Sequence, residues 1–480
     1  MVFSSLLFLF AFLTVQLIPY YLVKSVKAKN VILLAFSLVF YAWGGPKYLI
    51  LLVLESLISY LTAREIGKTE FKTMKKRWLI LDVVLLLSLL AVFKYTGFFL
   101  SNIQFIFHWP KELPEILLPI GISFYTFQLI SYVADVYRGE VEPQPKFWKV
   151  LLYSSLVHQC IAGPIVRYKT VASEIDERSI EISDVFAGIR RFSVGLAKKA
   201  ILANGCAAVA DALLPLDRLT AASASGPALW LGMAAYMLQI YLDFSAYSDM
   251  AIGMGRMVGF HYLENFDYPY TASTVQGFWR KWHISLSSFF RDYVYIPLGG
   301  NRKGLGRTIL NMFVVWFLTG FWHGASWNFI LWGLYFFVFL MLERFFLGRI
   351  LQKNLVTRVI GHFYTLFVVF LGWVLFKFND MGIVGEVVKG LFGGHAGASA
   401  LTAGSALLNN LFLLIFSVIA VFPIGKKLHE QLSRYAEITD RGWIRNGIRI
   451  CTAVIPVLLL ILSVLALVGD SYNPFLYFQF

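Results

Sequence analysis

The chain has 480 residues, of which 58% are hydrophobic and only 15% charged, and its formal net charge is +14. Soluble domains carry about 25% charged residues, so this composition excludes an ordinary soluble protein and predicts membrane-spanning α-helices. Nucleic acid is excluded as a partner, because the positive charges lie in short loops between apolar runs, the pattern that marks cytoplasmic loops of membrane proteins.

The first half of the chain offers apolar runs of about the length that a helix needs to cross ~30 Å of hydrocarbon. The first run predicts a retained helix that starts outside, and Gly44-Gly45-Pro46 predicts a turn between two shorter helices. A basic loop at 64–77 is assigned to the cytoplasm, and the loop at 109–114 to the outside. The predicted helices are 1–23, 31–43, 47–63, 78–103 and 116–137.

The second half contains two regions that are too short or too polar for ordinary spans. Residues 148–165 end at Gly163-Pro164 and suit a re-entrant segment, and residues 256–307 predict interfacial or re-entrant helices on the cytoplasmic side. A basic loop is expected at 426–449 and an outside location for the C-terminus. The remaining predicted helices are 186–210, 226–255, 308–322, 326–345, 358–378, 406–425 and 448–469. The fold class is therefore all-α, with about eleven spans in a single membrane domain over 1–480.

The most distinctive local feature is a histidine within small and aromatic residues, Thr319-Gly320-Phe321-Trp322-His323-Gly324-Ala325-Ser326-Trp327. The apolar run before it predicts that His323 lies roughly 20 Å into the membrane, at 1.5 Å per helical residue. A buried imidazole can change protonation near neutral pH and serve as a general base. A purely structural histidine, hydrogen-bonded to a neighbouring helix, is the alternative.

A second histidine, His283, lies within the unusual 256–307 region. It is followed by Arg291 and by the Gly-rich loop that contains Asn301, Arg302 and Lys303. Basic side chains and Gly-rich backbone at the cytoplasmic face are suited to the phosphates of a nucleotide-bearing donor. Binding of anionic membrane lipids is the alternative for Arg302 and Lys303.

Two predicted spans carry polar stripes that would be costly against lipid. The first holds Gln128, Tyr132 and Asp135, and the second holds Gln239, Asp243 and Tyr247, each on one helix face. The stripes predict the lining of a polar tunnel for the donor. The alternative is interhelical pairing, for example of Asp135 or Asp249 with Arg138 or Arg256.

These motifs, in this order, resemble the membrane-bound O-acyltransferase superfamily, and within it the bacterial alginate and peptidoglycan O-acetyltransferases. The resemblance covers nearly the whole chain, and its segments are 1–5, 118–128, 162–165, 243–250, 282–304, 320–324 and 473–480. It implies helices around a cytoplasmic funnel, with the superfamily's histidine at His323 and the branch's second histidine at His283. Val157-His158-Gln159 replaces the usual Phe-Pro-Gln, which leaves the role of His158 open.

The resemblance implies transfer of acetyl groups from a cytoplasmic donor, with acetyl-CoA expected and no bound cofactor or metal. The expected location is the bacterial inner membrane. The acceptor would be an exported polysaccharide, reached through a periplasmic or extracellular esterase-like acetyltransferase. Trp322 and the polar stripes would shape the tunnel. The alternatives are D-alanyl or other acyl transfer to an envelope polymer such as teichoic acid, a glycan transporter, and a scaffold without chemistry.

Overall fold

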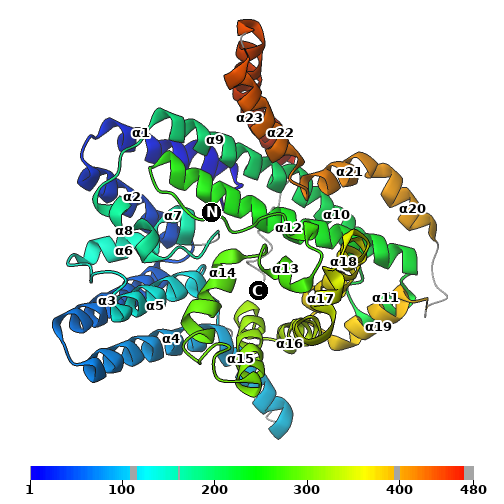
Figure 1. Cartoon of the computed structure of the whole chain (residues 1–480), viewed down its shortest axis with the longest axis horizontal. Helices are drawn as coiled ribbons and strands as arrows, with labels where there is room; N and C mark the ends of the chain where they lie inside the picture. The colour runs from blue at the N-terminus through cyan, green and yellow to red at the C-terminus, as the bar shows by residue number, and fades with distance from the viewer. Residues whose placement is uncertain (1, 109–115, 161–162, 394–399, 440, 470–480) are drawn as a thin grey trace.

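The computed structural model describes residues 2–108, 116–160, 163–393, 400–439 and 441–469. Every regular element in these residues is helical. The predicted loop at 109–114 and the C-terminal motif at 473–480 lie outside the described residues, as does Ala162. In Figure 1, the short helices α13 and α14 lie in the middle of the molecule, with the long helices arranged around them.

The N-terminal helices follow the predicted course, with different ends. The turn at Gly44-Gly45-Pro46 is confirmed: Gly45 has φ 144°, and Pro46 is the first residue of α3. The elements up to residue 160 are η1 Leu7–Leu13, α1 Thr14–Leu22, α2 Val26–Trp43, α3 Pro46–Lys68, α4 Lys72–Phe107, α5 Ile122–Arg138, α6 Phe147–Ser155 and α7 Val157–Cys160. The 148–165 region thus contains two helices too short to span the bilayer.

The middle of the chain supplies α12, the helix with the largest number of buried residues in the described part of the chain. Its stripe of polar residues is enclosed by neighbouring helices rather than by lipid. The elements from 168 to 257 are α8 Tyr168–Asp176, α9 Ile182–Ala197, η2 Lys198–Ala203, α10 Asn204–Leu213, α11 Arg218–Ser223 and α12 Gly226–Met257.

The region at 256–307 contains short helices packed against the centre of the molecule. These are η3 Pro269–Thr271, α13 Val275–Trp279, α14 Ile284–Phe290 and η4 Arg291–Tyr295. Trp282 and Phe278 are buried here and stack on one another, with ring centroids 5.5 Å apart. The region is thus built of short packed helices, while its interfacial or re-entrant character and its cytoplasmic location stay predictions.

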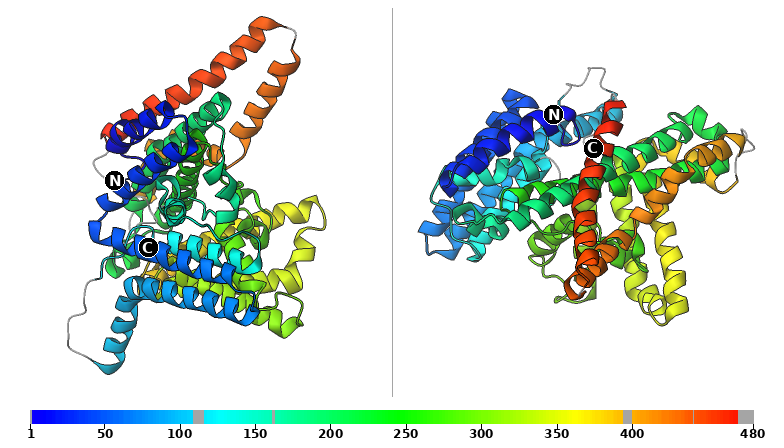
Figure 2. Two further views of the ribbon diagram at one scale, coloured as in Figure 1. Left: turned by 90° about the vertical axis from the view of Figure 1, so that its left-hand side faces the viewer. Right: turned by 90° about the horizontal axis from the view of Figure 1, so that it is seen from above.

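The C-terminal half differs from the prediction in two places. The predicted single helix at 406–425 is two helices, α20 and α21, with a bend of 67° between them. The predicted basic loop at 426–449 contains most of α22 and the start of α23, which extend away from the body of the molecule (Figures 1 and 2). The elements are α15 Leu305–His323, α16 Trp327–Leu342, η5 Glu343–Leu347, α17 Gly348–Leu351, α18 Leu355–Lys377, α19 Met381–Leu391, α20 Ala400–Asn409, α21 Leu411–Ala420, α22 Ile424–Ile438 and α23 Gly442–Gly469.

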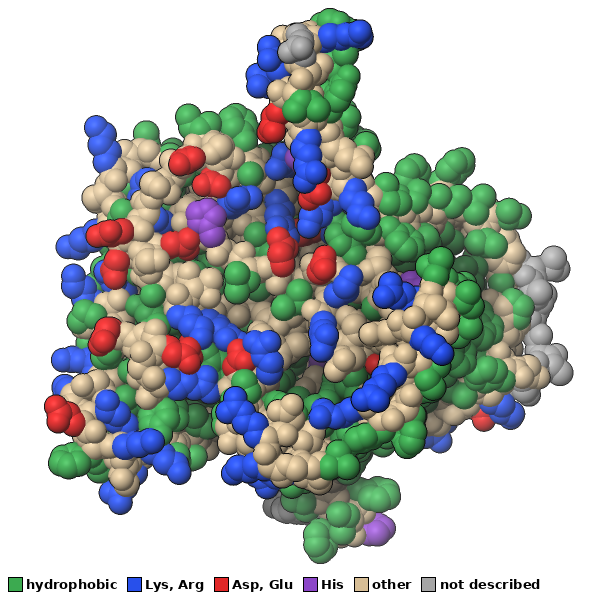
Figure 3. All heavy atoms as spheres, viewed as in Figure 1, with side chains coloured by type: hydrophobic (Ala, Val, Ile, Leu, Met, Phe, Trp, Pro, Cys, Tyr) green, Lys and Arg blue, Asp and Glu red, His purple; other side chains and the backbone are tan. Residues whose placement is uncertain are grey.

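Within the described residues, seven helices are long and apolar enough to cross a membrane, or eight if α20 and α21 form one span. The predicted count of eleven is not confirmed. The difference arises because α5 is short, and because α3 and α12 carry Ser, Tyr and acidic residues that the protein itself encloses. The space-filling view shows Lys and Arg over much of one face and hydrophobic side chains along its right-hand rim (Figure 3).

Candidate active site

The two predicted histidines meet around one tryptophan. The Trp322 ring lies 5.0 Å from the His323 ring and 5.8 Å from the His283 ring, centroid to centroid. All three side chains are buried. Residues forty positions apart in the sequence are therefore brought together in one apolar cluster.

His323 is the last residue of α15, and a close crossing of α15 with α16 supports it. A Cβ added to Gly320 would collide with the Phe329 carbonyl, and one added to Gly333 would collide with the Trp316 carbonyl. These glycines therefore allow the two helices to approach closely. The approach places Trp332 of α16 against His323, with ring centroids 4.9 Å apart at 82°.

His283 is held by a residue that the sequence analysis did not identify, Asn265. The Asn265 Oδ1 accepts from the Ser285 backbone N–H at 3.3 Å, and its Nδ2 donates to the Gly163 carbonyl at 3.4 Å, which fixes the orientation of the amide. The His283 Nδ1, 3.1 Å from Oδ1, must then be the donor. Its Nε2 carries the lone pair and has no hydrogen-bond partner among the described residues. Burial lowers the pKa of His283, so the imidazole is neutral.

Lys94 of α4 contacts the same cluster, and the sequence analysis also missed it. Its ammonium donates to the Trp322 carbonyl and lies 5.6 Å from the Trp322 ring centroid, while the Tyr95 hydroxyl donates to the Phe321 carbonyl at 2.9 Å. The last carbonyls of a helix lack partners within that helix, and a cation there is favourable. Lys94 and Tyr95 therefore fix the end of α15 that carries His323.

We expect Lys94→Met to lower the stability of the protein by about 1–2 kcal/mol, because the end of α15 loses its cation. The measurement is thermal unfolding of the purified protein in detergent. Lys76→Met is the matched control, since Lys76 is exposed and lies near the start of α4, away from the C-terminal carbonyls of its helix. Equal melting temperatures for the two variants would contradict this role of Lys94.

The predicted phosphate-binding residues lie away from the histidines. Asn301, Arg302 and Lys303 are exposed in the loop before α15, whose far end carries His323. The 19 residues of α15 separate the loop from His323 by about 27 Å at 1.5 Å per residue. Arg291 is exposed and pairs with Asp292, with Nε 2.7 Å from Oδ1.

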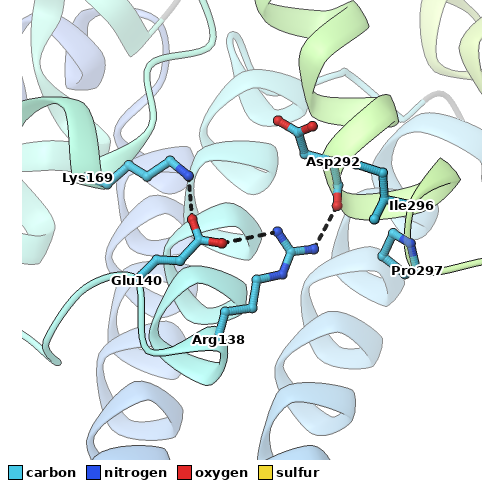
Figure 4. A pocket seen from close by; sticks show the side chains of 6 residues that line it. All are labelled: Arg138, Glu140, Lys169, Asp292, Ile296 and Pro297. Atoms are coloured by element: carbon cyan, nitrogen blue, oxygen red, sulfur yellow. Dashed lines mark hydrogen bonds and ion pairs between the residues drawn. The ribbon is translucent and has the colours of Figure 1, made fainter. Parts of the chain in front are cut away.

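A charged cavity of about 470 Å³ lies beside Arg291, where α5 ends and η4 begins. Figure 4 shows Glu140 between Lys169 and Arg138. The Arg138 guanidinium also donates to the Asp292 backbone carbonyl at 2.6 Å. Ile296 and Pro297 complete the lining next to Asp292. Burial opposes the charge on Asp292, but hydrogen bonds from Arg291 and Arg167 outweigh it and hold its pKa below the usual range.

Aromatic contacts connect this cavity to Trp322. Tyr293, next to Asp292, lies 4.9 Å from Phe289, which stacks on Phe127 at 4.3 Å, and Phe127 lies 5.9 Å from Trp322. All distances are between ring centroids. The cavity and the histidine pair are thus joined by a continuous row of packed aromatic side chains.

The polar stripes are held mainly by partners from other segments of the protein. The Tyr132 hydroxyl accepts from the Gln144 backbone N–H at 2.9 Å, and the Tyr247 hydroxyl lies 3.2 Å from the Ser4 Oγ. Asp243 forms a buried ion pair with Lys199 at 3.0 Å. Gln128 is fully buried, and neither end of its amide has a partner among the described residues. The α12 residue that contacts the histidine site is not one of the stripe residues but Phe244, whose ring centroid lies 4.7 Å from that of His283.

The partners suggested for two carboxylates were wrong. Asp249 pairs with Arg191 at 2.9 Å and Lys198 at 2.6 Å, not with Arg256. Asp135 accepts from the Tyr293 hydroxyl at 2.7 Å, not from Arg138. Arg256 follows Asp249 by two turns of the same helix, whereas α9 and η2 lie directly beside Asp249.

The family model described as MBOAT, membrane-bound O-acyltransferase family, matches residues 140–382, the segment that contains both histidines. The chain belongs to the membrane-bound O-acyltransferase family. It is therefore an acyltransferase enzyme and a multi-pass membrane protein, as its apolar helices also indicate. The resemblance noted from the sequence motifs is confirmed.

Curated members of the membrane-bound O-acyltransferase family are similar to this chain over different lengths. A Pseudomonas aeruginosa protein named "Probable alginate O-acetylase AlgI" is 35% identical, covering 100% of both chains. The Helicobacter pylori peptidoglycan O-acetyltransferase is 35% identical, covering 82% of this chain and 80% of its own length. The Bacillus subtilis teichoic acid D-alanyltransferase is 29% identical, covering 52% of this chain and 65% of its own length.

Proposed function

We propose that this enzyme transfers acetyl groups from cytoplasmic acetyl-CoA for O-acetylation of an exported polysaccharide. The observation that supports it best is the buried pair of imidazoles, His323 and His283, which both contact Trp322. The proposal includes an inner-membrane location, both termini outside, and a periplasmic or extracellular esterase-like acetyltransferase as partner. The final acceptor would be a polysaccharide such as alginate or peptidoglycan, which the names of the full-length and near-full-length relatives support.

In the proposed mechanism, His323 removes the proton from an acceptor hydroxyl that enters from outside. The hydroxyl oxygen forms a bond to the thioester carbonyl carbon, and the C–S bond breaks. The CoA thiolate leaves and takes up the proton from His323. His283, oriented by Asn265, presents its Nε2 lone pair and either orients the donor or assists the proton transfer.

Arg291, Arg302 and Lys303 are proposed to bind the donor phosphates. All three are exposed, so a water-soluble donor can reach them. Gln128, with an unpartnered buried amide, is proposed to contact the donor in the tunnel, together with Trp322. Tyr132, Asp243 and Tyr247, which have partners within the protein, support the walls of the bundle instead of binding the donor directly.

D-alanyl transfer is the second candidate, since the Bacillus subtilis relative is named for it. The acetyltransferases match more of the chain at higher identity, which favours acetyl transfer. In this test, as in the CoA-release assays below, purified protein in liposomes is given the partner acetyltransferase and a polysaccharide as acceptor. It then receives either acetyl-CoA or a D-alanyl carrier-protein thioester, and free thiol is followed. Thiol release from acetyl-CoA alone is expected. Release only from the D-alanyl thioester would overturn the assignment of the donor.

A further inference from the structure

Three buried indole N–H groups have no hydrogen-bond partner among the described residues: those of Trp279, Trp322 and Trp332. Their side chains are 7%, 4% and 0% exposed. A buried indole N–H normally finds an acceptor. Another buried tryptophan of this chain follows that rule, because Trp373, which is 1% exposed, donates to the Tyr270 hydroxyl at 3.2 Å.

The three unpartnered donors gather at the histidine site, although they come from three different helices. Trp322 of α15 contacts both His323 and His283. Trp332 of α16 contacts the His323 ring at 4.9 Å, and Trp279 of α13 contacts Trp332 at 5.4 Å. Two tryptophans with unpaired N–H groups, Trp322 and Trp332, therefore contact the His323 ring directly, and Trp279 packs against Trp332.

The surroundings of Trp332 offer no oxygen acceptor that explains its burial. Its ring neighbours are Phe336 at 5.3 Å, Phe376 at 5.2 Å and Trp373 at 6.2 Å. Leaving a buried donor unpaired costs free energy, and a leucine or phenylalanine would fill the same space without that cost. An unpaired N–H beside the catalytic candidate is suited to an acceptor that the substrate supplies.

We propose that the indole N–H groups of Trp332 and Trp322 form the oxyanion-binding site of the enzyme. They donate to the carbonyl oxygen of the acyl thioester, which becomes negatively charged when the acceptor oxygen bonds to the carbonyl carbon. Donors that are fixed in a water-excluded site stabilise such a charge without reorganising. The inference rests on the proposed acyl transfer and adds the group that binds the reacting carbonyl.

Trp332→Phe tests the inference, because phenylalanine keeps an aromatic ring and removes only the donor. We expect kcat for CoA release from acetyl-CoA to fall about 10²- to 10³-fold, the usual effect of losing one such donor, with a smaller change in KM. The melting temperature in detergent should change little, since no hydrogen bond within the protein is lost. The assay uses the full chain in liposomes.

Trp373→Phe is the matched control. Trp373 is buried in the same aromatic cluster, but its N–H is already bound to Tyr270. This variant should lose stability and keep its kcat. Suppose that the wild-type enzyme is active in this assay and Trp332→Phe has the same kcat. The inference is then wrong, and an N–H···π contact explains why the indole N–H has no oxygen or nitrogen acceptor. If the wild-type enzyme itself releases no CoA, the result contradicts the proposed acetyl transfer on which the inference rests.

A spectroscopic readout separates hydrogen bonding from packing. In a His323→Gln background, acetyl-CoA labelled with ¹³C at the thioester carbonyl can be bound without turnover and its C=O stretch recorded by infrared difference spectroscopy. Adding Trp332→Phe should move that stretch to higher wavenumber, because the carbonyl loses a donor. Adding Trp373→Phe should leave it in place. An unchanged stretch after Trp332→Phe would overturn the inference.

Discussion

Replacement of His323 by glutamine is expected to lower CoA release by about 10²- to 10⁴-fold, the usual contribution of a general base. Glutamine approximates the size of the imidazole and retains hydrogen-bonding groups, but it cannot accept the proton of an acceptor hydroxyl near neutral pH. The packing with Trp322 and Trp332 should be largely kept, so the variant should remain folded. The measurement is the initial rate of CoA release from acetyl-CoA in liposomes.

His362→Gln is the control for this experiment, because His362 is a half-buried histidine outside the site, with its Nδ1 3.1 Å from the Ala272 backbone carbonyl. Its rate should stay close to that of wild type. A folded His323→Gln variant with the wild-type rate would remove His323 as the base. It would also favour a glycan transporter, which tolerates this substitution.

Replacement of Asp243 by asparagine is expected to destabilise the protein by about 3–5 kcal/mol, because it leaves the buried Lys199 ammonium without its counter-charge. The two side chains are 1% and 4% exposed and lie 3.0 Å apart. The measurement is thermal unfolding of the detergent-solubilised protein. Lys199→Met combined with Asp243→Leu should restore much of the loss, because neither charge is then buried.

Asp211→Asn is the matched control for that pair. Asp211 pairs with Lys377 at 3.3 Å, but its carboxylate is 65% exposed, so water and salt screen the interaction. Its melting temperature should stay near that of wild type. If Asp243→Asn melts at the same temperature as Asp211→Asn, Asp243 is not an essential partner of Lys199 and does not support the wall of the bundle.

The helices and their turns followed closely from sequence pattern, because apolar run length and Gly-Pro punctuation are local signals. The turn at Gly45 and the short helices within 256–307 are examples. The exception is α22, which was taken for a loop on account of its charges. Ile424, Leu428, Leu432 and Tyr435 recur at helical spacing along it, so periodicity was the better guide.

The histidines of the site were found from sequence, but most of their partners were not. Asn265 and Lys94 stand in stretches with no motif of their own, and they reach the site only through packing of distant helices. The polar stripes show why: spacing identifies one face of a helix as polar, but it does not identify the neighbour. Asp243 therefore pairs with Lys199 of η2, while Phe244, one residue later, contacts His283.

The most direct test of the central claim follows the acetyl group across the bilayer. Liposomes containing the enzyme receive [¹⁴C]acetyl-CoA outside, and the partner acetyltransferase with a polysaccharide acceptor is enclosed inside. The account predicts labelled polysaccharide inside, an equal amount of free CoA outside, and neither product with His323→Gln. Entry of intact acetyl-CoA, or labelled polysaccharide formed equally well by the His323→Gln variant, would contradict it.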